Sequence, residues 1–121
     1  MVSISQAVRS AIEKFYTGTC DIIERQKVPD GNLTKFEEEK EKKNVPCRLS
    51  YRTYNNTNTD EGANEVSQVA RLFLAPEIEI KAGSKIEVTQ AGRTVAYKKS
   101  GQPAVYESHQ EIGLELFDRW A

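Results

Sequence analysis

His109 is the only histidine in the 121-residue chain, and it lies in the stretch Glu107-Ser108-His109-Gln110-Glu111. A carboxylate and a hydroxyl beside an imidazole are groups of general acid–base catalysis, so one hypothesis makes His109 a general base. Neighbours in sequence need not share one side of a strand, however. We therefore favour a partly exposed structural imidazole just before the last strand.

Other signatures of enzymes and metal sites are absent from the sequence. It has no GxSxG, P-loop, HExxH or GxGxxG pattern, each of which arranges reactive groups or backbone amides around a substrate. Cys20 and Cys47 have no CxxC pair and no nearby histidine to complete a zinc site. We predict that both are small core residues, and the sequence leaves a disulfide between them open. We expect no enzyme activity, no cofactor and no metal.

The charge balance argues against strong nucleic-acid binding. The chain has 17 basic and 18 acidic residues, a net charge of −1, so it has no basic field to hold polyphosphate. The tyrosines could form a stacking platform for single strands, but no basic groove accompanies them. The apolar runs are far shorter than the roughly 20 residues that span a bilayer, and no signal peptide is recognisable. We expect a protein made and kept in the cytosol, with no membrane partner.

The chain length suits a single domain over residues 1–121. Apolar residues recur at steps of three and four from Ile4 to Phe15, which predicts an N-terminal helix over 3–16. Beyond Gly18, short runs bounded by Gly, Pro, Asn and Asp predict strands. Val28-Pro29-Asp30-Gly31-Asn32 predicts a hairpin turn, and Ala91-Gly92 predicts another tight turn. The sequence therefore predicts a mainly β fold: a small β-barrel of six or seven short antiparallel strands. The candidate strands are 19–26, 33–43, 45–51, 66–74, 85–90, 93–98 and 111–118, with a further short run at 104–106.

Two polar segments interrupt this pattern. The Glu/Lys stretch 37–43 fits either a surface helix or an edge strand protected by charge, and we favour the edge strand. Its charges indicate a solvated face rather than a metal-binding or partner-binding tract. Residues 52–65 offer one aromatic residue, Tyr54, and nothing else from which to build a core. We predict one long flexible loop there, because unstructured segments of this length in compact domains usually have a function or are disordered.

Four motifs together resemble a known family. They are Thr17-Gly18-Thr19-Cys20-Asp21-Ile22, Val45-Pro46-Cys47-Arg48-Leu49-Ser50-Tyr51, Ile80-Lys81-Ala82-Gly83-Ser84-Lys85-Ile86 and Tyr106-Glu107-Ser108-His109-Gln110-Glu111. Their order resembles that in minor capsid proteins of siphophages and prophages of Gram-positive bacteria, and is closest to the head-closure type. The likeness extends from Ser3 to Ala121 and consists of turn and strand patterns. The Glu/Lys stretch is more highly charged than the corresponding region of the family.

The resemblance implies a β-barrel that assembles as a ring beneath the portal and adaptor proteins of the phage neck. Loops would project into the channel and hold packaged DNA. The channel-loop candidates are Arg52, Thr53, Tyr54, Asn55, Asn56, Thr57, Asn58, Thr59, Asp60 and Glu61. Near the C-terminus, Phe117 and Trp120 either cover the barrel end or meet a partner. With Arg119, they are the candidates for partner contact.

The leading hypothesis is a structural virion protein at the head-tail junction, made in the bacterial host cytoplasm. It would close the DNA-filled head and provide a surface for tail attachment. The isolated protein would be a monomer, and portal, adaptor and tail proteins would be its partners. One alternative is a tail-completion or tail-terminator protein, which also uses small barrels. A stand-alone nucleic-acid-binding β-barrel is a further alternative, with the charge balance against it.

Overall fold

The computed structural model describes residues 4–58 and 63–120, which form one helix and six strands. The helix is α1 (Ile4–Glu13), and it precedes every strand. The strands are β1 (Gly18–Asp30), β2 (Leu33–Asn58), β3 (Ala63–Leu74), β4 (Lys85–Gln90), β5 (Arg93–Val105) and β6 (Gln110–Leu116).

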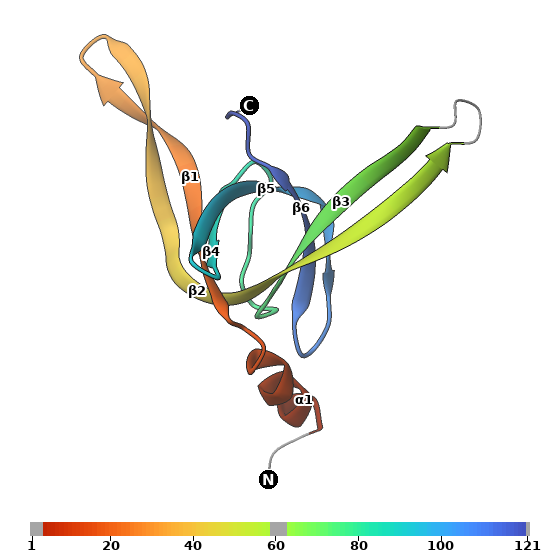
Figure 1. The fold of residues 1–121 in the computed structure, drawn as a ribbon. Helices are drawn as coiled ribbons and strands as arrows, with labels where there is room; N and C mark the ends of the chain where they lie inside the picture. Colours follow the sequence, from red (N-terminus) through yellow and green to blue (C-terminus); the bar gives the residue numbers. More distant parts are fainter. Residues whose placement is uncertain (1–3, 59–62, 121) are drawn as a thin grey trace.

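The six strands close into a barrel in the order β1-β2-β3-β6-β5-β4, and every neighbouring pair is antiparallel (Figure 1). Pairing of β4 with β1, from Thr19↔Thr89 to Ile23↔Lys85, completes the ring. Closure leaves no open sheet edge around the barrel itself. The prediction of a mainly β barrel with an N-terminal helix is confirmed.

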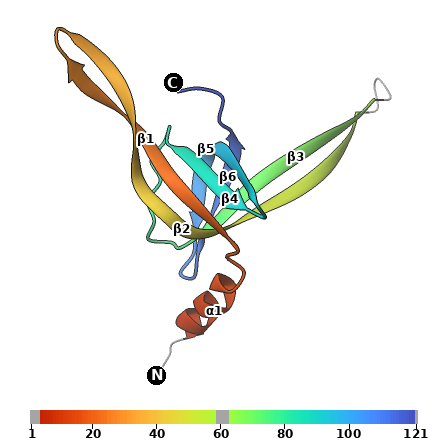
Figure 2. The same ribbon diagram turned by 60° about the vertical axis from the view of Figure 1, so that its left-hand side comes forward.

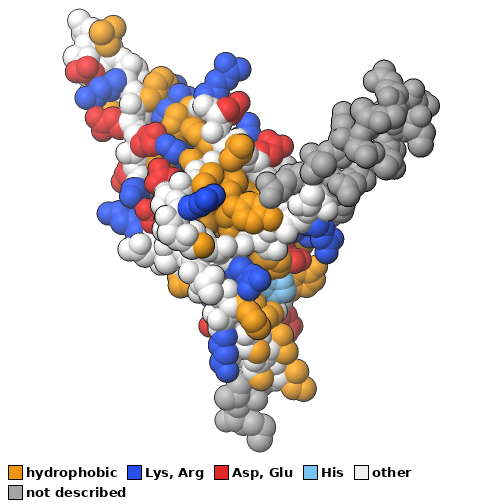
Figure 3. All heavy atoms as spheres, in the orientation of Figure 1, with side chains coloured by type: hydrophobic (Ala, Val, Ile, Leu, Met, Phe, Trp, Pro, Cys, Tyr) orange, Lys and Arg blue, Asp and Glu red, His pale blue; other side chains and the backbone are white. Residues whose placement is uncertain are grey.

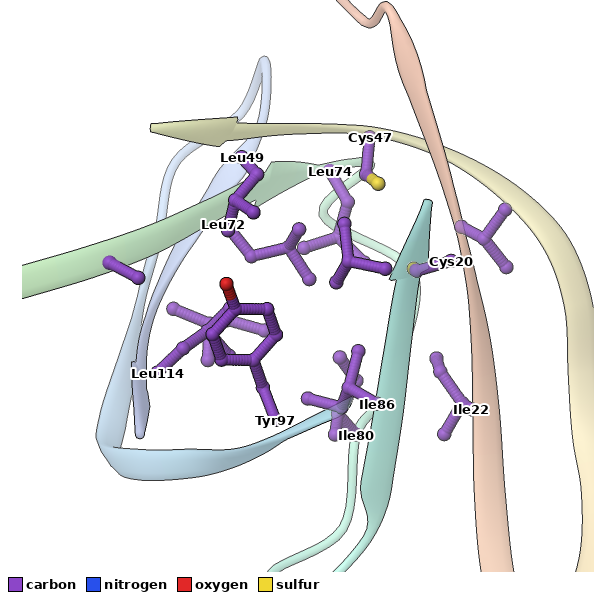
Figure 4. Packing of buried hydrophobic residues seen from close by; sticks show 14 residues of the cluster. Cys20, Ile22, Cys47, Leu49, Leu72, Leu74, Ile80, Ile86, Tyr97 and Leu114 are labelled. Carbon is purple, nitrogen blue, oxygen red and sulfur yellow. The ribbon is translucent and has the colours of Figure 1, made fainter. Parts of the chain in front are cut away.

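Alternation along the strands builds the core. Successive side chains of a strand point to opposite faces, and one face of each strand carries the buried apolar residues. Figure 4 shows them meeting inside the barrel. The fully buried side chains include Ile22, Cys47, Leu72, Leu74, Ile86 and Ile112. Cys20 and Cys47 are both buried free thiols, as predicted for small core residues.

Glycines stand where tight turns need a positive φ. Gly31, at φ 62°, turns β1 into β2, and Gly92, at φ 76°, follows Ala91, at φ 54°, between β4 and β5. Two consecutive positive φ values match the right-handed twist of the flanking strands in a two-residue hairpin turn. The turn predicted at 91–92 is confirmed, and the one predicted around 28–32 is confined to the two residues after Asp30.

The prediction of a long loop over 52–65 is wrong for most of that segment. Arg52 to Asn58 continue β2, residues 63–65 begin β3, and 59–62 lie outside the described residues. The backbone partners run from Arg52↔Val69 to Asn58↔Ala63. Hydrogen bonds between two backbones need no alternation of apolar residues, so strands that extend beyond the core can still form a ladder. Absence of core-forming side chains was therefore a poor guide to backbone pairing.

Other boundaries also differ from the prediction. The helix predicted over 3–16 ends at Glu13, because Phe15 and Tyr16 donate their N–H groups to Ile12 and Glu13, which tightens the last turn. Ser3 lies outside the described residues. The short strand predicted at 104–106 is the end of β5, which continues past a register shift between Ser100 and Ala104. The charged stretch 37–43 is strand, as favoured, but β2 is 26 residues long rather than short.

Two strand pairs extend well beyond the barrel. In Figures 1 and 2, the β1–β2 hairpin and the β2–β3 hairpin project from one end, where the C-terminus also lies, and α1 lies at the opposite end. The barrel thus separates two projecting hairpins from a helix.

Closure around the core predicts that alanine substitutions of two leucines change the free energy of unfolding by very different amounts. Leu72 is 0% exposed and Leu33 is 75% exposed. Leu72→Ala should lower the free energy of unfolding by about 3 kcal/mol, because it leaves a cavity, and Leu33→Ala by less than about 0.5 kcal/mol. Urea denaturation of both variants measures the difference, and equal effects would contradict a core centred on the barrel.

Candidate functional site

The β2–β3 arm consists of Arg52–Asn58 in β2 and Ala63–Val69 in β3. Pairing of β3 with β6 covers only Ala70 to Leu74, and pairing of β1 with β2 does not extend beyond Cys47. Among the described residues, the β2–β3 arm therefore pairs with no third strand. A two-stranded ribbon without further support is marginally stable in water, so this arm depends on the barrel for its position.

The channel-loop candidates lie on this arm wherever the structure describes them. Arg52, Thr53, Tyr54, Asn55, Asn56, Thr57 and Asn58 follow one another along β2. Thr59, Asp60 and Glu61 lie outside the described residues. The sequence analysis identified the segment that leaves the barrel, although it assigned the wrong backbone conformation. A role in a channel stays a prediction.

The β1–β2 arm consists of Glu24–Asp30 in β1 and Leu33–Glu39 in β2. Its ladder runs from Glu24↔Glu39 to Asp30↔Leu33, whereas β1 pairs with β4 only as far as Ile23. Most of its residues are exposed. The charged strand and the turn of this hairpin were predicted from the sequence, but its extension beyond the barrel was not.

The C-terminal segment packs against the base of the β1–β2 arm. The indole Nε1 of Trp120 donates to Glu38 Oε2 at 3.3 Å. The guanidinium of Arg25 lies 4.2 Å from the ring centroid of Phe36 and 5.8 Å from that of Trp120. An arginine between two aromatic rings is held by cation–π attraction and by contact with its apolar stem.

Phe117 joins this segment to the barrel. Its N–H donates to the Ala96 carbonyl at 3.0 Å, and its ring meets that of Trp120 edge to face at a centroid distance of 5.1 Å. Lys85 Nζ lies 5.2 Å from the Phe117 ring and 3.3 Å from Glu38 Oε1. Phe117 and Trp120 are half-buried, and Arg119 is exposed. Phe117 and Trp120 thus cover part of their own molecule, and contact with a partner stays a prediction.

Asp21 holds the corner where β2 bends from the arm into the barrel. Register shifts between β1 and β2 occur on both sides of Ile22, and Asn44 adopts a positive φ of 53°. Asp21 Oδ1 accepts from the Asn44 N–H at 2.8 Å, and Oδ2 accepts from Lys40 Nζ at 3.0 Å. The bond from Asn44 and then that from Lys40 lower the pKa of Asp21 below its ordinary value of 3.8, because both favour the charged carboxylate.

Gln90 likewise holds the backbone of β2 by side-chain hydrogen bonds, near the β2–β3 arm. Its side-chain Oε1 accepts from the Leu49 N–H at 2.8 Å, and its Nε2 donates to the Leu49 carbonyl at 3.0 Å. Both backbone groups of Leu49 are thereby satisfied just past the end of the β1–β2 ladder. A side-chain amide can replace a strand neighbour in this way because it carries one acceptor and two donors.

His109 belongs to an aromatic stack. Its ring centroid lies 4.9 Å from that of Tyr106 and 5.9 Å from that of Phe73. Ser108 Oγ is 2.9 Å from His109 Nδ1, and no described carboxylate is hydrogen-bonded to the ring. The general-base hypothesis lacks the orienting group that usually accompanies a serine and a histidine.

The described residues carry neither a metal-site nor a membrane-span signature. Within 4–58 and 63–120, no group of three or more His, Cys, Asp or Glu side chains is placed to hold a metal ion. No helix in the described part of the chain combines the length and apolar character needed to cross a membrane.

No family model matches the chain, and no curated protein matches it. Among solved structures, it is similar to protein xkdH of the phage-like element PBSX from Bacillus subtilis. That match has a TM-score of 0.49 and 12% sequence identity, and it covers 81% of this chain and 91% of that chain. At this identity, the likeness concerns the course of the chain and assigns no role to individual residues.

The corner at Asp21 predicts a pH dependence of stability. A lowered folded-state pKa gives stability that is fully present above the ordinary value of 3.8 and is lost as the pH falls through the lower folded value. Asp21→Asn should therefore lower the free energy of unfolding by about 1 kcal/mol at neutral pH. The difference from the wild type should vanish in strong acid. Denaturation at neutral pH and in strong acid measures this difference in the free energy of unfolding.

Asp30→Asn, at the exposed tip of the β1–β2 arm, is the matched control for this charge removal. It should change stability by less than about 0.5 kcal/mol at either pH. Equal stabilities of Asp21→Asn and the wild type at neutral pH would contradict the role given to the corner.

Proposed function

We propose that the protein is a structural virion protein of a phage neck. It assembles as a ring under the portal and adaptor proteins, closes the DNA-filled head and offers a surface for tail attachment. It performs no catalysis and needs no cofactor. The observation that carries this proposal is the β2–β3 arm, a ribbon that leaves a closed barrel without the support of a third strand among the described residues.

The composition of the arm suits a place beside DNA that must move past it. From Arg52 to Glu61, the sequence has one basic residue and two acidic residues among Thr, Asn and Tyr. Polyphosphate is held by clusters of Lys and Arg that release counterions, and this segment has no such cluster. An arm of this composition narrows a channel without gripping the DNA backbone.

The two arms also give a physical reason for assembly, which would stabilise them. Each is a two-stranded ribbon with unpaired outer edges, and such ribbons gain stability when neighbours surround them. A ring brings many copies of the arm together and limits its freedom. The isolated chain remains a monomer, since the ring forms on the portal and adaptor as template.

The C-terminal segment is the proposed site of a second contact. Arg119 is exposed beside the half-buried Phe117 and Trp120. A guanidinium next to aromatic side chains is a frequent element of protein interfaces. We assign this surface to the contact with adaptor or tail proteins in the virion, and the protein reaches it from the host cytoplasm where it is made.

The test shortens the β2–β3 arm in the phage genome that encodes this chain. Residues 54–67 are replaced by an Asn-Gly turn between Thr53 and Gln68, which are backbone partners. The purified variant should unfold within about 1 kcal/mol of the wild type, because the core residues lie elsewhere. Heads that have incorporated it should lose packaged DNA or fail to hold tails. Particle imaging and packaged-DNA content are the measurements.

Incorporation of the variant into particles, measured by mass spectrometry, is the control that separates loss of function from loss of assembly. A normal infectious yield with the shortened arm incorporated would contradict the proposal. Wild-type protein found at the distal end of the tail, rather than at the head, would contradict it as well.

A further inference from the structure

Helix α1 exposes its apolar side. Ile4, Val8 and Ile12 recur every four residues, so they lie along one stripe of the helix. Ile4 is 85% exposed and Val8 is 44% exposed. Arg9, on another side, holds the helix to the connection after β3 through its ion pair with Glu77. Arg9 thus faces this connection, and the stripe is exposed at Ile4 and Val8 and half-buried at Ile12.

This stripe forms one wall of a groove, which we call the helix groove. Toward the start of the helix, Ile4 and Val8 face Glu107 and Ser108. Toward its end, the lining residues are Ile12, Phe15, Tyr16, Arg48, Ser50, Phe73 and His109. The two parts adjoin through neighbouring residues of the chain, since Ser108 lines the first and His109 lines the second. Figure 3 shows hydrophobic side chains along the helix and around the pale-blue histidine.

Positive charge surrounds the Phe15 end of the groove. Arg48 lies over the Phe15 ring at 5.7 Å, and Arg71 lies opposite Ser50 in the β2–β3 ladder. Neither arginine has an ion pair with another described residue. The strand neighbour of Phe73 on β6, Glu111, is paired with neither of them. Of the acids near the helix, Glu13 and Glu77 are both bound by Arg9, and Glu107 lies at the other end of the groove, beside Ile4 and Val8.

We propose that the helix groove binds an acidic amphipathic helix of another protein. The apolar side of that helix packs on the exposed stripe of α1 and on Phe73, as in other helix-in-groove contacts. Its carboxylates lie over Arg48 and Arg71. This surface lies at the end of the barrel opposite the two arms (Figures 1 and 2), so the inference does not depend on the role given to the arms.

The charges also fix the direction of the bound helix. Glu107 stands at the Ile4 end of the groove and Arg48 at the Phe15 end. A helix favours acidic residues in its first turn and basic residues in its last turn. Its first turn therefore lies at Arg48 and its last turn at Glu107, which makes it antiparallel to α1.

The experiment titrates the full-length, ¹⁵N-labelled protein with a helix-forming peptide of about 15 residues. Leucines occupy one side of the peptide, with glutamates in the first turn and lysines in the last. The control peptide has the same composition with the two charged turns exchanged. The first peptide should shift the amide signals of Ile12, Phe15, Phe73 and His109 and bind about tenfold more tightly than the control.

Two variants distinguish binding in the groove from nonspecific attraction between charges. Arg48→Glu should abolish or reverse the preference between the peptides, whereas Arg93→Glu, an exposed arginine that does not line the groove, should preserve it. Dispersed amide spectra confirm that both variants fold. The proposal is overturned by equal affinities for the two peptides, by shifts that map outside the groove, or by no binding. Groove signals that shift on dilution of the protein alone would assign the site to a second copy and overturn it too.

Discussion

Closure of the six-stranded sheet around inward-facing apolar side chains is the constraint on which the other features depend. The barrel closes only where each strand has neighbours on both sides, and that part holds the core residues from Cys20 to Leu114. Beyond this closed ring, the described parts of β1, β2 and β3 have no third strand to pair with. The remaining parts of β1, β2 and β3 therefore leave the barrel as two ribbons. The short β4 lies entirely within the ring.

A single strand, β2, links both arms. It is 26 residues long and enters the barrel from one arm and leaves it in the other. Two polar side chains hold it where its ladder changes partners: Asp21 beside Asn44, and Gln90 beside Leu49. Each supplies the hydrogen bonds that the backbone loses there, and buried backbone groups are costly to leave unpaired. Both arms are therefore attached to the barrel through one strand that is held at these two positions.

The barrel could be predicted from the sequence because alternation reports burial. The strands around Ile22, Leu72 and Ile112 alternate clearly, and the turn at Gly92 was visible from its residue type. The β2–β3 arm could not be recognised in the same way, since strands that pair beyond the core need no such alternation. The Asn- and Thr-rich segment was therefore interpreted as a loop, although it pairs along β3.

The assembly surfaces were predictable only in part. The aromatic residues near the C-terminus were identified as candidates, but their packing on Arg25 and Glu38 depends on a hairpin whose direction no local pattern gives. The helix groove depends on residues far apart in the chain, such as Phe15, Phe73 and His109. Periodicity identified the apolar stripe of the helix, but it could not indicate that the barrel leaves this stripe uncovered.

Hydrogen–deuterium exchange of the isolated protein tests the central claim most directly, because it compares the stability of barrel and arms residue by residue. The barrel segments 70–74, 86–90 and 112–114 should exchange slowly, at rates set by global unfolding. The arm segments 24–30, 33–39 and 52–58 should exchange much faster through local opening. Equal protection of arms and barrel in the monomer would show that the arms are stable by themselves and would contradict the account.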